Sequence, residues 1–149
     1  MEDCLYQHPT RWGVVAEEAF TMLHDIYSLG VVLLEIGLWQ SLLEWNEDEK
    51  CYIFAPFLTD LVVGATKEGK TMRADHRALK VKERLLEMAR IWLPPSMGET
   101  YTKVVVACLE VMEGGMVKLN DFDRPNDEMG RVGTAYIKYV VSKLENLKV

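Results

Sequence analysis

The chain has 149 residues, with a hydrophobic content of 49% and a charged content of 27%, as in an ordinary globular protein with one sizeable core. The net charge of −6 argues against nucleic acid as a partner, because nucleic-acid binding requires a basic face. Cys4, Cys51 and Cys108 share no metal-binding spacing, and Met1 is followed by acids rather than by the start of a signal peptide. We therefore expect a reduced, cytoplasmic protein without a metal site.

The first strong pattern is HDIYSLGVVLLEIGLW, residues 24–39. Asp25 is suited to capping a helix, and the apolar residues that follow cover nearly every face at the helical period. This predicts a central helix over about 25–37 that is buried on all sides. It is too short to cross a bilayer, so no membrane association is expected. Upstream, residues 14–23 are expected to form a short helix.

Further helices are predicted after the central one, for about five to seven helices in all. The acids Glu44, Glu47, Asp48 and Glu49 suit either a cation site or, as the favoured interpretation, the start of a following helix. Residues 76–92 show helical periodicity, with Leu79 and Ile91 among the residues expected to face the core, and the prolines within 93–98 predict a break. Two more helices are predicted, over residues 100–112 and about 127–147. The basic residues within 67–90 are expected on a solvated face.

No segment shows sustained period-two alternation, so no strand is expected. The prediction is an all-α fold, organised as a single helical domain over residues 1–149, with the central buried helix at about 25–37 surrounded by further helices. His8, His24 and His76 are expected to be non-catalytic.

Tyr6-Gln7-His8-Pro9 followed by Asp25-Ile26-Tyr27-Ser28-Leu29-Gly30 resembles the C-terminal lobe of eukaryotic protein kinases. His8 and Pro9 fall at the A-P-E end of the activation segment, and Asp25 to Gly30 resembles the start of the central helix of that lobe. Cys108-Leu109 and Arg124-Pro125 resemble its last conserved segment. Within the superfamily, the closest resemblance is to fungal kinase-like signalling domains.

The resemblance implies structural roles for five residues. His8 and Pro9 would form the turn that ends the activation segment, and Asp25 would brace the backbone of the catalytic loop. Gly30 would permit close backbone packing. Arg124 would be the late arginine that normally pairs with the A-P-E glutamate. Thr10 stands at the position of that glutamate, so the usual ion pair is expected to be missing.

The sequence contains no H-R-D, no D-F-G and no G-x-G-x-x-G, the motifs that position ATP and magnesium in kinases. The resemblance therefore implies a non-catalytic C-terminal fragment with no cofactor of its own. ATP and magnesium are implied only for a complete parent, which is either a protein kinase or a pseudokinase in signalling. The expected partners are proteins, including the missing upstream kinase half, and an isolated half-lobe should expose apolar surface.

Two alternatives remain open. One is a non-catalytic helical module for protein–protein interaction. The other is a P-loop nucleotide binder, because residues 64–71 match G-x-x-x-x-G-K-[ST] through Gly64, Gly69, Lys70 and Thr71. A P-loop requires a parallel sheet around it, and no other strands are predicted. We therefore expect this match to be a basic loop between helices and assign no cofactor-binding residue.

Overall fold

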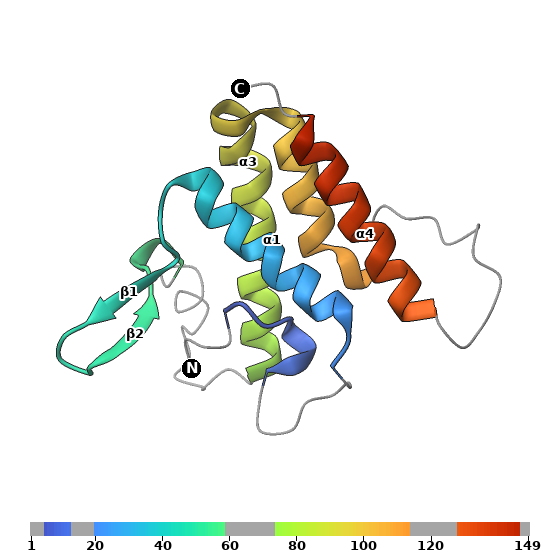
Figure 1. The fold of residues 1–149 in the computed structure, drawn as a ribbon. Helices are drawn as coiled ribbons and strands as arrows, with labels where there is room; N and C mark the ends of the chain where they lie inside the picture. The colour runs from blue at the N-terminus through green and yellow to red at the C-terminus, as the bar shows by residue number, and fades with distance from the viewer. Residues whose placement is uncertain (1–4, 13–19, 59–73, 114–127, 147–149) are drawn as a thin grey trace.

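The computed structural model describes residues 5–12, 20–58, 74–113 and 128–146, and in these ranges the chain is mostly helical (Figure 1). Its elements are η2 (Pro9–Arg11), α1 (Met22–Leu38), β1 (Leu43–Asn46), β2 (Cys51–Phe54), α3 (Ala74–Leu109), η3 (Val111–Glu113) and α4 (Glu128–Glu145). The predicted helical class is confirmed. The expectation that the chain has no strands is wrong, because β1 and β2 form a small antiparallel sheet.

Helix α1 begins earlier than predicted and is capped by a different residue. Its N-cap is Thr21, whose backbone N–H donates to Nδ1 of His24 at 3.0 Å, and Asp25 lies inside the first turn as an exposed side chain. The prediction of Asp25 as the cap is therefore wrong, although an acid in the first turn still favours the helix electrostatically. The helix ends at Trp39, which adopts the left-handed conformation.

Helix α1 lies across the two halves of α3, with α4 beside them (Figure 1). Its fully buried side chains include Val31 and Leu34, and the hydroxyl of Tyr101 in α3 donates to the carbonyl of Leu33 at 2.6 Å. The expectation of burial on all sides is wrong, because one face of α1 is open. The exposed residues of that face are described with the candidate site.

Helix α3 is a helical hairpin rather than one straight rod. The chain turns at Gly98, whose φ of 81° and ψ of 166° are accessible to glycine but not to residues with a Cβ. The predicted break at 93–98 thus lies at its last residue, and the helix continues through Pro94 and Pro95. The first half of α3 also differs from expectation, since Leu79 and Ile91 are more than half exposed.

The two strands form a hairpin where the acidic cluster was expected to begin a helix. The register pairs Leu43 with Phe54 and Trp45 with Tyr52, and the acids occupy the turn and its approach. Asn46 Oδ1 accepts from the N–H groups of Asp48 and Glu49 at 2.9 and 3.1 Å. This side-chain turn closes the hairpin and replaces the predicted helix start.

Candidate functional site

The His8-Pro9 turn is fixed against the start of α1. Pro9 opens the 3₁₀ helix η2, and the buried His8 ring packs edge-on to Tyr27 with ring centroids 5.0 Å apart. The Ser28 hydroxyl donates to the carbonyl of Tyr6 at 2.6 Å, which ties the preceding residue to the same helix. The turn therefore forms part of the core, although it is only three residues long.

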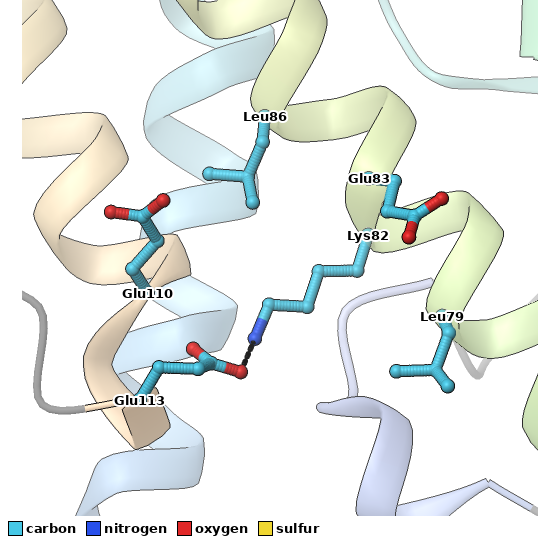
Figure 2. Close-up of a pocket in the computed structure, with 6 residues that line it drawn as sticks. All are labelled: Leu79, Lys82, Glu83, Leu86, Glu110 and Glu113. Carbon is cyan, nitrogen blue, oxygen red and sulfur yellow. Dashed lines mark hydrogen bonds and ion pairs between the residues drawn. The ribbon is translucent and has the colours of Figure 1, made fainter.

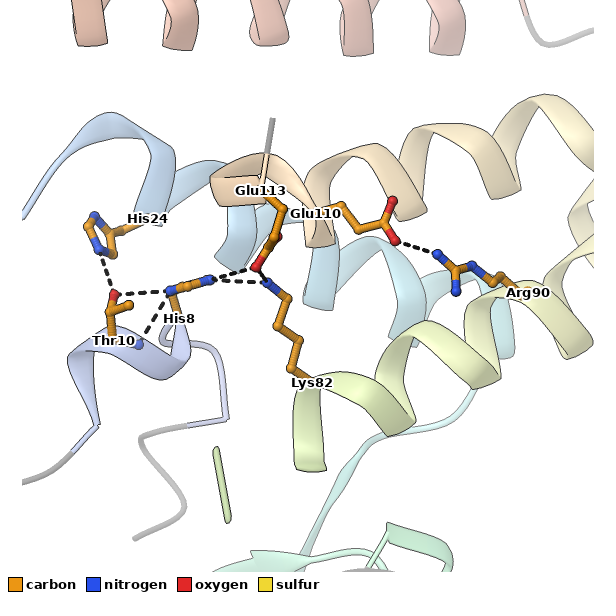
Figure 3. Close-up of polar contacts among 7 residues, drawn as sticks. All are labelled: His8, Thr10, His24, Lys82, Arg90, Glu110 and Glu113. Carbon is orange, nitrogen blue, oxygen red and sulfur yellow. Dashed lines mark hydrogen bonds and ion pairs between the residues drawn. The ribbon is translucent and has the colours of Figure 1, made fainter. Parts of the chain in front are cut away.

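Thr10 joins two histidines (Figure 3). Its hydroxyl oxygen lies 3.0 Å from Nδ1 of His8 and 3.4 Å from Nε2 of His24. Because Nδ1 of His24 accepts from the Thr21 N–H, its Nε2 carries the proton and donates to Thr10. The Thr10 backbone N–H lies 3.4 Å from the same Nδ1 of His8, so this ring also caps the start of η2.

A buried lysine completes this cluster from the other side. Lys82 is 5% exposed, and its Nζ donates to Nε2 of His8 at 3.2 Å and forms an ion pair with Glu113 (Figure 3). An ammonium can only donate, so Nε2 of His8 is the acceptor of this bond. The contacts of Lys82 join η2, α3 and η3. Its burial contradicts the expectation that the basic residues of 67–90 face solvent.

His8 makes the stability of the protein depend on pH. Burial and the Lys82 ammonium lower the pKa of His8 from 6.5 to about 4, against a smaller opposing effect of Glu113. Between these pH values the unfolded chain binds a proton that the folded chain does not. We therefore expect stability to fall as the pH decreases from 6.5 to about 4. Urea unfolding of wild type and His8→Gln at several pH values checks this, since equal pH slopes would contradict it.

A cavity of about 420 Å³ lies beside Lys82, between the first half of α3 and the segment 110–113 that follows its second half (Figure 2). Its lining residues are Leu79, Lys82, Glu83, Leu86, Glu110 and Glu113. Glu113 compensates the charge of Lys82, and Glu110 forms an ion pair with Arg90. The six lining residues include no hydroxyl, thiol or imidazole. The three carboxylates and two leucines of the lining therefore suit apolar or positively charged groups.

The residues that carry the kinase resemblance are brought together only in part. Gly30 lies against the end of α3, where an added Cβ would be 2.8 Å from Cys108 Cβ and 3.2 Å from the Leu109 nitrogen. Burial raises the pKa of the Cys108 thiol to about 12, so it is a packing group rather than a reactive one. Arg124 and the P-loop-like Gly64, Gly69, Lys70 and Thr71 lie outside the described residues.

The open face of α1 is formed by Asp25, Leu29, Val32 and Ile36, which we call the outer stripe. These residues follow the helical spacing of three and four, and all are exposed, the three apolar ones from 37% at Leu29 to 50% at Ile36. The helix that holds the core together thus presents one acid and three apolar side chains to solvent. Contiguous exposed apolar residues of this kind mark interaction surfaces.

Of the cluster residues, Lys82 and Glu113 were missed by sequence reasoning. Lys82 falls at helical spacing among the buried Ala78, Val81 and Leu85, and a basic residue inside an apolar stripe is the signal that would have found it. Glu113 follows the last turn of a predicted helix and carries no such signal.

No family model, curated protein or solved structure matches the chain. Within the part of the chain that the structure describes, no three His, Cys, Asp or Glu side chains group to hold a metal ion. No helix in those ranges is both long and apolar enough to span a membrane.

Proposed function

We propose that this chain is the helical C-terminal subdomain of a protein-kinase-like domain. It is non-catalytic itself and acts as the surface on which a segment bearing the catalytic loop docks. The observation that carries the proposal is the outer stripe, with Asp25 at its first position and exposed apolar residues along the rest of the helix. An acid that braces a neighbouring backbone must be accessible to it, and Asp25 is.

Two further contacts support the same proposal. Gly30 and Cys108 belong to the two separate motifs that carry the kinase resemblance, and they meet in the core. The His8-Pro9 turn lies at the start of the same helix, tied to it through Ser28 and Tyr27. The loss of the A-P-E glutamate at Thr10 accompanies a different ion pair at this turn, between the buried Lys82 and the exposed Glu113.

The complete domain would be an ATP-dependent protein kinase or a pseudokinase in signalling, with ATP and magnesium held by residues that this chain does not contain. The coding sequence immediately upstream of Met1 distinguishes these forms. In-frame H-R-D and D-F-G motifs would indicate a kinase, and degenerate motifs would indicate a pseudokinase. A stop codon directly upstream, with no kinase-like segment joined to the transcript, would contradict the proposal.

The outer stripe predicts that the chain self-associates when it is produced alone, because apolar side chains without a partner bury one another. Sedimentation velocity should show a concentration-dependent shift for wild type that Val32→Glu abolishes. Ile91→Glu, at an exposed apolar position on α3, is the matched control and should behave as wild type. A wild-type monomer at all concentrations would count against a docking role for this face.

A direct test uses the upstream segment itself. Co-expression of that segment with this chain should give a stable complex, and Asp25→Ala together with Val32→Glu should dissociate it. Retention of the complex in this double variant would show that the outer stripe is not the contact surface.

A further inference from the structure

The β1–β2 hairpin projects from the helical body (Figure 1), yet its base is firmly held. The carboxylate of Glu35 in α1 accepts from the Leu42 N–H at 2.8 Å and from the Ser41 hydroxyl at 3.2 Å. The N–H of Ala55 donates to the Leu42 carbonyl at 2.9 Å, which closes the base of the ladder. The hairpin is therefore presented in a fixed orientation.

One face of this hairpin carries two exposed aromatic rings. Trp45 and Tyr52 are directly paired across the strands, with ring centroids 5.2 Å apart in an edge-to-face arrangement, and they are 48% and 55% exposed. Because side chains alternate along a strand, the half-buried Leu43 and Phe54 continue this face toward the base. Phe54 stacks on Trp12, so the aromatic face extends from the core to solvent.

The surroundings of these rings are strongly acidic. Glu44, Glu47, Asp48 and Glu49 are exposed on the hairpin, and Lys50 is the single base between Leu43 and Phe54. Aromatic side chains are enriched in the energetic centres of interfaces. They also attract Arg and Lys through the ring face, while carboxylates at the rim attract the same groups over a longer range. The combination complements a positively charged partner and repels an acidic one.

We propose that the hairpin patch, made of Trp45, Tyr52 and the acids of the hairpin, docks a basic, extended segment of a partner protein. The alkyl stems of Arg or Lys side chains pack on the two rings, and their charges reach Glu47, Asp48 and Glu49. A second copy of this acidic chain is a poorer occupant, because it would bring like charge to the patch. The proposal is independent of the docking role assigned to the outer stripe.

The test is a binding titration with defined peptides. A labelled twelve-residue peptide in which Arg alternates with Val is compared with the same peptide carrying Glu in place of Arg, by fluorescence anisotropy. We expect the basic peptide alone to bind, with affinity that falls as salt rises. Trp45→Ala and the triple variant E47Q/D48N/E49Q should each weaken it at least about tenfold.

The control variants separate this site from the others. Val32→Glu on the outer stripe and Glu87→Gln on α3 should leave peptide affinity unchanged, and circular dichroism verifies that each variant is folded. Equal binding of both peptides, no binding of the basic peptide, or unaltered affinity in the two hairpin variants would overturn the proposal. Self-association that Trp45→Ala abolishes would also overturn it, in favour of contact between copies.

Discussion

Leu34→Ala is expected to lower the free energy of unfolding by about 2–5 kcal/mol. Leu34 is completely buried in the core, on a helix that packs against α3. Truncation removes the apolar area it buries and leaves a cavity that rigid neighbours fill only partly. Chemical denaturation followed by circular dichroism measures the loss, which should be among the largest of any single truncation in this helix.

Val32→Ala on the same helix is the matched control. Val32 is 41% exposed, so at protein concentrations where the chain is monomeric its truncation should change stability by no more than about 0.5 kcal/mol. Equal losses for Leu34 and Val32 would mean that α1 is buried on both faces in solution, for example within a tight oligomer. The pair therefore tests the orientation of the helix as well as its packing.

Gly30→Val is expected to destabilise the fold by about 3 kcal/mol. The added Cβ would meet Cys108 Cβ at 2.8 Å, and backbone atoms of Cys108 and Leu109 lie within 3.3 Å of the same point. Backbone cannot move aside as the end of a flexible side chain can, so α1 and α3 must separate. The gain in helix propensity over glycine is smaller than this cost.

A double-mutant cycle shows whether the cost comes from this contact. Gly30→Ala should destabilise less than Gly30→Val, and Cys108→Gly in the Gly30→Ala background should restore part of the loss. Additive effects of the two substitutions would contradict the close approach of these residues. Wild-type stability of Gly30→Val would do so as well.

The helices could be predicted because their signals are local. The apolar period of residues 24–39 indicated α1, and that of 76–92 indicated the first half of α3. The sequence of 127–147 indicated α4. The predicted boundaries of these helices were wrong by a few residues. The cap was misassigned because Asp25 is the obvious acceptor. Thr21 is the N-cap of α1, and His24, the third residue of the helix, completes the cap. A histidine imidazole that accepts a hydrogen bond at this position is a weaker sequence signal than an acid.

The β1–β2 hairpin and the polar cluster around His8 and Lys82 could not be predicted, because both depend on contacts that form only in the folded chain. Glu47, Asp48 and Glu49 have the composition of a helix start, and only the Asn46 turn and the pairing of Trp45 with Tyr52 favour strands. The exposure of Val32 and Ile36 was missed because periodicity identifies apolar faces but not whether a partner covers them. The ion pair of Lys82 with Glu113 joins residues 31 positions apart, and although the apolar stripe around Lys82 indicates its burial, nothing in the sequence indicates Glu113 as its partner.

The turn at Gly98 also has a consequence for the order in which the chain folds. It brings Arg90 and Glu110 together across only 20 residues, whereas the hydrogen bond from Tyr101 to Leu33 spans 68. Closing the longer loop costs about 1 kcal/mol more in chain entropy. The two halves of α3 are therefore the natural nucleus, and α1 is the helix that docks onto a hairpin already formed.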